Sequence, residues 1–249
     1  MEPLILTVCF LGALVQITTG LGLIVAPMLL AFYEPVDAIQ MTGALTLLIV
    51  AGIAPFVRRR IMPYELTRLA IGTLAGLLVG SALLLMASIN AIRVAALMAL
   101  AYCLVRYITV MIQGPSREVL ESAEPVVERA SLFYGMASGV MSATLAMPGP
   151  LALVFLRSRG LNPARVRATV FALMVGSYSG MLVISIALSG LSDTVLAGIT
   201  IYLLPTLAGV VLGQLISNRL PDLFFDVMTT LLMFSTLLVL GLKIVNSYF

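Results

Sequence analysis

An uncharged apolar run from Pro3 to Tyr33 most constrains what this chain can fold into. The run is longer than the about 20 residues that an α-helix needs to cross a bilayer, yet its centre reads Thr-Thr-Gly-Leu-Gly at 18–22. Glycine loosens a helix, and threonine hydroxyls compete for its backbone hydrogen bonds. Non-helical backbone at membrane depth is tolerated only where it is buried in protein or lines a cavity. We therefore predict a buried break near Thr18–Gly22.

A matching feature stands in the second half of the chain, the segment MSATLAMPGP at 141–150. Two broken apolar segments at matching positions of two halves are the best sequence pointer to the binding site of a transporter. The competing interpretation is a pair of kinked spans without a ligand. One constant shift aligns the two segments and places Gly12 on Gly135, Thr19 on Ser142 and Pro27 on Pro150.

The two halves match at further places, in the same order. The motif TLAGLLVG at 73–80 corresponds to TLAGVVLG at 206–213, and Pro35 corresponds to Pro163. Small differences in shift are those that loop insertions would produce. The small residues of the TLAGxxxG motif predict close helix packing. We divide the chain into a first membrane repeat at 1–113, a cytoplasmic linker at 114–128 and a second membrane repeat at 129–249.

Composition places the chain in a lipid bilayer. Hydrophobic residues make up 61% and charged residues 10% of the chain, whereas about a quarter of the residues of a soluble domain are charged. The net charge of +3 lies in loops and does not suggest a nucleic-acid partner. We expect eight apolar segments, at 4–32, 38–57, 66–87, 91–112, 130–156, 168–188, 195–216 and 223–245.

The distribution of basic residues decides between two topologies, because cytoplasmic loops are enriched in Lys and Arg. If all eight segments cross the membrane, eight of the 14 basic residues lie inside. If 4–32 and 130–156 are hairpins that dip to mid-membrane and return, 12 of the 14 lie inside, and only Arg93 and Lys243 lie outside. We therefore predict an all-α polytopic membrane protein of two inverted repeats, each a broken, re-entrant helical hairpin plus three transmembrane helices. One discontinuous span in each half is the alternative.

The residue types argue against an enzyme. The chain has no histidine, and its two cysteines, Cys9 and Cys103, stand in apolar runs without a CxxC motif. An intramembrane hydrolase needs an acid–base set or a metal. We expect no catalytic residue, no metal and no cofactor. We also expect no acidic residue inside a span, which leaves a proton relay without a carrier.

The chain resembles the TauE/SafE family of sulfite and organosulfonate exporters, and the resemblance covers nearly its whole length. Family members usually carry a richer glycine run at both breaks, whereas the second break here is Ala-Met-Pro-Gly-Pro at 146–150. The resemblance implies a multi-pass protein that moves small anions across a bacterial cytoplasmic membrane, often outward. It is carried by the break followed by Pro27, the start of the next segment at Pro35 and Ala38, and the same arrangement at Pro150, Pro163 and Ala164.

The breaks themselves suggest chemistry for an anion. The first N–H groups of each returning helix lack intrahelical partners and carry the positive end of the helix dipole. Two such tips at one midplane site would suit an anion, with hydroxyls as added donors. For each hydroxyl the alternative is a hydrogen bond to its own helix. We expect no Lys or Arg near either tip. The candidate substrate-binding residues are Gln16, Thr18, Thr19, Gly20, Gly22, Ser142, Thr144, Pro148, Gly149 and Tyr178.

The predicted function is secondary transport of a small anion, either sulfite, an organosulfonate or a similar organic acid, most simply as an exporter. A carrier for small carboxylates is one alternative. A non-transporting membrane scaffold or assembly subunit is another, although it leaves the paired breaks unexplained. The partners we expect are the anionic substrate and the lipid bilayer, and a homodimer is left open.

Overall fold

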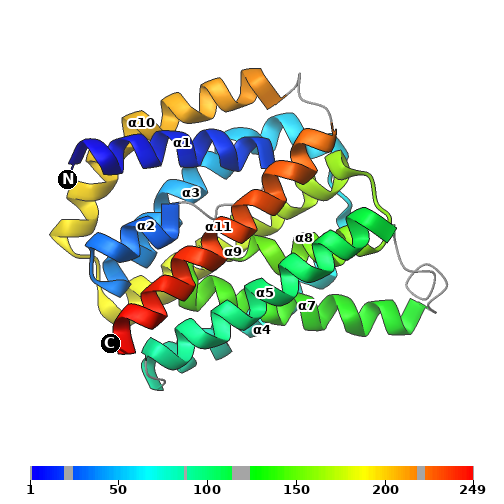
Figure 1. The fold of residues 1–249 in the computed structure, drawn as a ribbon, viewed down its shortest axis with the longest axis horizontal. Helices are drawn as coiled ribbons and strands as arrows, with labels where there is room; N and C mark the ends of the chain where they lie inside the picture. Colours follow the sequence, from blue (N-terminus) through cyan, green and yellow to red (C-terminus); the bar gives the residue numbers. More distant parts are fainter. Residues whose placement is uncertain (1, 20–24, 87–88, 114–123, 218–221, 249) are drawn as a thin grey trace.

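The computed structural model describes residues 2–19, 25–86, 89–113, 124–217 and 222–248, and within these ranges it contains helices and no strand (Figure 1). The all-α prediction is therefore confirmed. The helices are α1 (Glu2–Thr19), α2 (Val25–Phe32), α3 (Pro35–Val57), the 3-10 turn η1 (Arg58–Arg60), α4 (Pro63–Met86), α5 (Ile89–Gln113), α7 (Glu124–Leu145), α8 (Gly149–Ser158), α9 (Pro163–Ser189), α10 (Asp193–Ser217) and α11 (Asp222–Tyr248).

Local sequence explains where several helices begin and end. The helices α3, α4 and α9 each begin at a proline, whose missing N–H has no intrahelical partner to lose at that position. The side chain of Asn162 caps α9 by accepting a hydrogen bond of 2.9 Å from the Ala164 N–H. At the other end of α9, Gly190 has a φ of +75°, which L-residues with a side chain rarely adopt.

Four helices are long and apolar enough to cross a membrane: α3 with η1, α4, α9 and α10. The helices α5 and α11 contain 25 and 27 residues. At 1.5 Å per residue such helices are about 37 to 40 Å long, which exceeds a hydrocarbon core about 30 Å thick. The chain is thus a polytopic membrane protein, as the sequence predicted.

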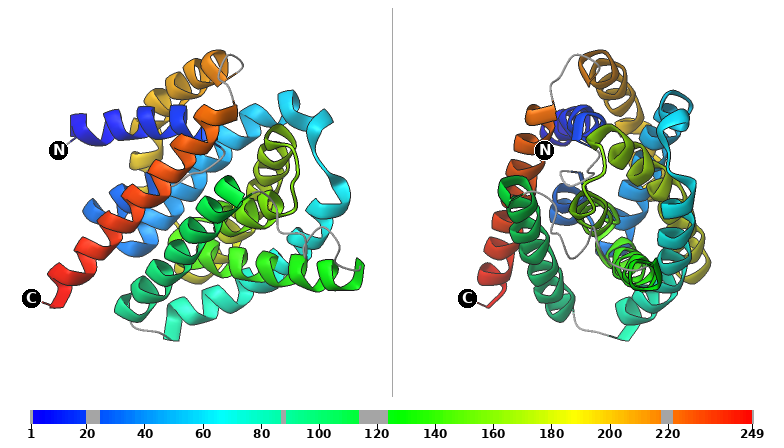
Figure 2. Two further views of the ribbon diagram at one scale, coloured as in Figure 1. Left: turned by 45° about the vertical axis from the view of Figure 1, so that its right-hand side comes forward. Right: turned by 90° about the vertical axis from the view of Figure 1, so that its right-hand side faces the viewer.

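The second predicted break is present, whereas the residues between α1 and α2 lie outside the described part of the chain. The first helix ends at Thr19 and the next begins at Val25, while α7 ends at Leu145 and α8 begins at Gly149. Gly20 and Gly22 lie outside the described residues. Each broken segment is a hairpin, because α2 returns to the end of the molecule where α1 begins, and α8 returns to the end where α7 begins (Figure 1). The right-hand view of Figure 2 shows α8 in the interior, with α5 and α11 on one side and α4 on the other.

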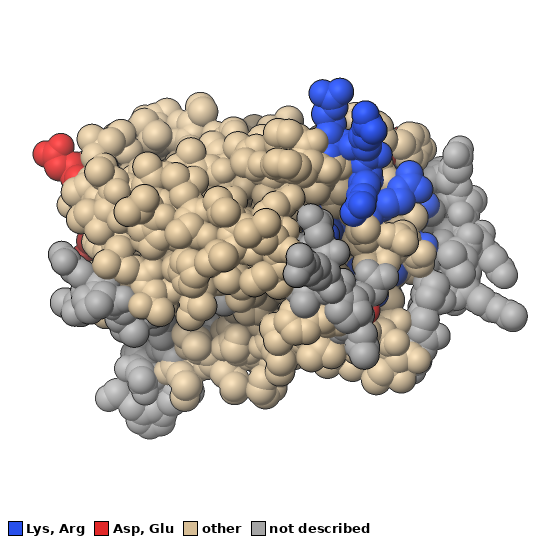
Figure 3. Space-filling view, turned by 90° about the horizontal axis from the view of Figure 1, so that it is seen from above, with Lys and Arg blue, Asp and Glu red and all other residues tan. Residues whose placement is uncertain are grey.

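The two ends of the molecule differ in charge. At one end, Arg159 at the end of α8 pairs with Glu65 of α4, so the arginines around 157–167 lie beside Arg58–Arg60. At the other end, Ser192 donates a hydrogen bond of 2.9 Å to Asp37. Basic side chains accordingly gather at one end of the face shown in Figure 3, which we call the basic end. The structure thus brings the two arginine groups to one end, as the hairpin topology requires.

Packing between the halves occurs in exchanged pairs. The first arm of each hairpin packs on the TLAGxxxG helix of the other half, α7 on α4 and α1 on α10, while α3 packs on α9 and α5 on α11. A Cβ atom at Gly76 would collide with the Met136 carbonyl oxygen, and one at Gly209 with the Phe10 carbonyl oxygen. The predicted close packing of this motif is therefore confirmed. The division at 1–113, 114–128 and 129–249 stays a prediction.

The glycine contact gives a stability prediction. Gly76→Ala should lower the free energy of unfolding by about 2 kcal/mol, because the added methyl overpacks the α4–α7 interface. Gly176→Ala is the matched control, since a Cβ there meets no atom within 4 Å and alanine favours a helix over glycine by about 1 kcal/mol. Thermal unfolding in detergent measures both. Equal melting temperatures for the two variants would contradict the packing interpretation.

The two ends give a topology prediction. Arg165 and Thr194 are both exposed and lie near opposite ends of α9. In a background with Cys9 and Cys103 replaced by alanine, a membrane-impermeant maleimide applied to intact cells should label the Thr194→Cys variant and not the Arg165→Cys variant. Both should react after the membrane is disrupted. Labelling of the Arg165→Cys variant in intact cells would reverse the orientation inferred from the basic end.

Candidate functional site

The second break begins with a strained residue. Ala146 has a φ of +52°, and among the described residues it is the non-glycine residue with a positive φ. Its N–H donates to the Ser142 carbonyl oxygen at 3.0 Å, and the Met147 N–H donates to the Met141 carbonyl oxygen at 3.3 Å. The first of these is the 5→1 bond of an αL helix ending, which normally has glycine at this position. Alanine in this conformation costs about 1 to 2 kcal/mol, and such strain is concentrated at functional sites.

Neighbouring side chains hold this break in place. The hydroxyl of Tyr178 donates a hydrogen bond of 2.7 Å to the Ala146 carbonyl oxygen, and the hydroxyl of Ser138 donates to the Pro148 carbonyl oxygen. Both side chains are fully buried. The Tyr178 hydroxyl thus fixes the backbone of the break, and its contact with substrate stays a prediction.

The break presents donors to its surroundings. The first N–H groups of α8, at Gly149 and Leu151, have no intrahelical partner because of helix geometry, and among the described residues no side chain caps this N-terminus. Ser142 lies in the last turn of α7 and accepts a hydrogen bond of 2.8 Å from Ser177 of α9. The hydroxyl hydrogen of Ser142 is therefore available for a further bond. The predicted residues Ser142, Pro148 and Gly149 thus lie together at one buried tip.

The threonines at the breaks bond to their own helices. Thr18 and Thr19 both donate to the Val15 carbonyl oxygen, at 2.9 and 2.8 Å, and Thr144 donates to the Val140 carbonyl oxygen at 2.8 Å. These are the hydrogen bonds that sequence reasoning gave as the alternative to substrate binding. A role for these three hydroxyls in substrate binding stays a prediction.

Gln16, in the last turn of α1, is fully buried and has an unsatisfied amide. Neither Oε1 nor Nε2 has a hydrogen-bond partner among the residues that the structure describes. A buried polar group without a partner costs about 1 to 3 kcal/mol, so each case in a native protein needs an explanation. A ligand that accepts from Nε2 beside the first break would explain this one.

Arg167 contradicts the expectation that no basic residue lies near a tip. Its Nη1 donates a hydrogen bond of 3.1 Å to the Thr18 carbonyl oxygen, in the last turn of α1. The sequence placed Arg167 in a loop, whereas it lies one turn inside α9, which begins at Pro163. Proline is favoured at the first position of a helix, so Pro163 is the sequence signal that places Arg167 inside α9. Its cation stabilises the negative C-terminal end of α1.

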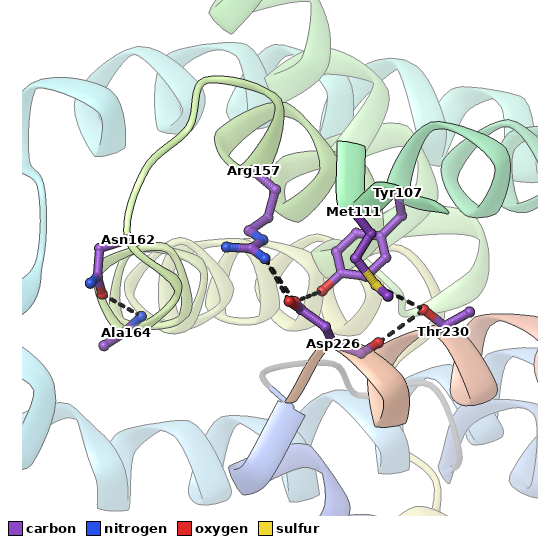
Figure 4. Close-up of polar contacts among 7 residues, drawn as sticks. All are labelled: Tyr107, Met111, Arg157, Asn162, Ala164, Asp226 and Thr230. Atoms are coloured by element: carbon purple, nitrogen blue, oxygen red, sulfur yellow. Dashed lines mark hydrogen bonds and ion pairs between the residues drawn. The ribbon is translucent and has the colours of Figure 1, made fainter. Parts of the chain in front are cut away.

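Asp226 contradicts the expectation that no acidic residue lies in a span, because it falls inside the predicted segment 223–245 and belongs to α11. Its carboxylate accepts hydrogen bonds of 2.6 Å from the Tyr107 hydroxyl and of 2.8 Å from Arg157 Nη2 (Figure 4). The side chains of Arg157 and Asp226 are 15% and 13% exposed. This cluster ties the end of α8 to α5 and α11, so the second hairpin is fastened to the periphery at the basic end.

These features define a class of protein. A polytopic helical bundle with two helical hairpins, packed in exchanged pairs between the halves, has features that many secondary transporters share. A model of the sulfite exporter TauE/SafE family matches residues 4–242, and the chain belongs to this family. No curated protein and no solved structure matches the chain. Members of the family are transporters, which fits the expectation that the protein is not an enzyme.

The Asp226 cluster gives a stability prediction. Asp226→Asn keeps the shape of the side chain but leaves Arg157 without a counter-ion, which should cost about 1.5 to 3 kcal/mol of stability. The control is Glu128→Gln, because Glu128 pairs with Arg68 at 3.3 Å but is 49% exposed, and exposed pairs contribute about 0 to 1 kcal/mol. Thermal unfolding of both variants in detergent compares them. A Glu128→Gln variant that unfolds earlier than the Asp226→Asn variant would contradict this ranking.

Proposed function

We propose that the protein is a secondary transporter that exports a small anion, such as sulfite, an organosulfonate or a similar organic acid, across the bacterial cytoplasmic membrane. In this proposal the two hairpin breaks form the substrate site near the bilayer midplane. Support comes from the family match over 4–242 and from the second break, which is buried inside the bundle.

The unsatisfied amide of Gln16 is the observation that carries the proposal. Folding alone gives no reason to bury both polar atoms of this side chain without partners. An anion beside the first break would accept from Nε2 and so supply one of the missing bonds. A hydrogen bond to a charged group contributes about 1.5 to 3 kcal/mol, so the ligand-bound state recovers free energy that the empty protein lacks.

The second break supplies complementary donors. The open N–H groups at the start of α8 and the hydroxyl of Ser142 are donors, and the positive end of the helix dipole favours an anion there. No carboxylate is among the residues that hold this break. We infer that the anion is bound by amide, hydroxyl and backbone donors, which lets it be released more readily than from a direct ion pair.

Transport requires that the site open to each side in turn, and the two ends of the molecule are fastened differently. At the basic end, ion pairs join α8 to α4 and α11 through Arg159–Glu65 and Arg157–Asp226. At the other end, the hydroxyls of Tyr33 and Tyr202 lie 2.6 Å apart and join the end of α2 to α10. In an inverted repeat, releasing one set while keeping the other exposes the site to one side.

The experiment that tests the proposal pairs Gln16→Leu with Gln40→Leu. Removing the unsatisfied amide should raise the melting temperature of the ligand-free protein and weaken sulfite or sulfonate binding about tenfold to a hundredfold. Gln40→Leu should lower the melting temperature, because Gln40 Nε2 donates to Ser185 Oγ at 3.1 Å and to the Gly190 carbonyl oxygen at 3.0 Å. Ligand-induced melting shifts and counterflow in proteoliposomes measure the two effects.

The same panel separates the remaining candidates. Counterflow with small carboxylates but not with sulfite or sulfonates would favour the carboxylate carrier. Absence of counterflow for every anion, with normal folding, would favour the scaffold. Unchanged anion affinity in the Gln16→Leu variant would remove the first break from the substrate site.

A further inference from the structure

A cavity of about 160 Å³ opens at the basic end, next to the first hairpin tip. Five elements meet there: the last turn of α1, the end of α3, η1, the first turns of α9 and the end of α10. The lining residues are Ile17, Ile53, Phe56, Val57, Arg60, Arg167, Phe171 and Gln214.

The polar lining of this cavity is cationic and amide. Arg60 and Arg167 bring two guanidinium groups, and Gln214 brings an amide, while none of the described lining residues is acidic. Two cations near each other in a pocket repel unless an anion lies between them. Guanidinium groups also match the oxygen geometry of sulfur, carbon and phosphorus oxyanions. The buried walls of Ile17, Ile53 and Phe171 leave room for a short apolar substituent.

Arg167 connects this cavity to the transport site. Its Nη1 bonds the Thr18 carbonyl oxygen in the last turn of α1, two residues from Gln16. A guanidinium has five N–H donors in a fixed fork, so it can hold a carbonyl oxygen and an oxyanion together. Arg60 is exposed in the 3-10 turn and has no ion-pair partner among the residues that the structure describes. It can therefore meet an anion that arrives from solution.

We propose that this cavity is a second anion site, in which Arg60, Arg167 and Gln214 bind a small free oxyanion before it reaches the first break. The ligand class is an oxyanion with at most a short apolar tail, such as sulfite or methanesulfonate. The cavity's position at the basic end makes it a cytoplasmic loading site for export. That role rests on the proposed function, whereas anion binding in the cavity does not.

The test measures binding by the full chain in neutral detergent, with sodium sulfite and sodium methanesulfonate as probes and anion-induced melting shifts as the readout. Arg60→Gln and Gln214→Leu should each weaken binding about tenfold, because each removes donors to the anion. Arg59→Gln is the matched control, since Arg59 carries the same charge on the same turn but does not line the cavity. It should change the affinity less than twofold.

Two results would overturn the proposal. Equal weakening by Arg59→Gln and Arg60→Gln would show that binding depends on diffuse surface charge. A melting shift with short-chain phosphatidylglycerol, but none with sulfite or methanesulfonate, would assign the cavity to a lipid headgroup. Counterflow in proteoliposomes keeps the two proposals apart. If the wild-type protein transports the anion and the Arg60→Gln variant binds it as tightly as wild type, the loading site is wrong and the transporter proposal stands. If the cavity binds anions but no anion is transported, the transporter proposal is wrong and the anion site stands.

Discussion

Backbone hydrogen bonding inside a membrane is the constraint on which the rest of the structure depends. Hydrocarbon offers no partners, so a chain that interrupts a helix at membrane depth must surround the interruption with protein. The second break meets this condition with side chains from two helices: Tyr178 bonds the Ala146 carbonyl oxygen and Ser138 bonds the Pro148 carbonyl oxygen. Every residue of α8 from Gly149 to Leu156 is also buried. The outer helices separate this break from the lipid.

The helices surround the hairpins closely because their backbones approach one another at glycine residues. The first arm of each hairpin lies against the TLAGxxxG helix of the other half, and Gly76 and Gly209 bring carbonyl oxygens of the arm next to their own Cα atoms. In a bilayer, where lipid tails are as apolar as leucine, such contacts replace the hydrophobic effect as the source of helix association. Neither hairpin is therefore held mainly by its own repeat.

The polar groups divide into two kinds according to what they do. Arg157, Asp226 and Tyr107 satisfy one another and fasten helices together. Gln16 is buried with no hydrogen-bond partner among the described residues, and Ala146 is held in a strained conformation. Satisfied polar clusters stabilise a single arrangement, whereas unsatisfied and strained groups reduce stability and persist where function requires them. Gln16 lies beside the first break and Ala146 at the second, which is where the proposed substrate site lies.

The sequence by itself determined the features that local chemistry controls. Apolar run lengths located the helices, Ala-Met-Pro-Gly-Pro located the second break, and small residues located close packing. Only the tertiary structure decided which distant groups meet. Arg167 reaches Thr18 across 149 positions and Arg157 reaches Asp226 across 69, and the missing partners of Gln16 become visible only once its neighbours are placed. Such contacts depend on how helices cross and rotate, which the periodicity of one apolar helix does not specify.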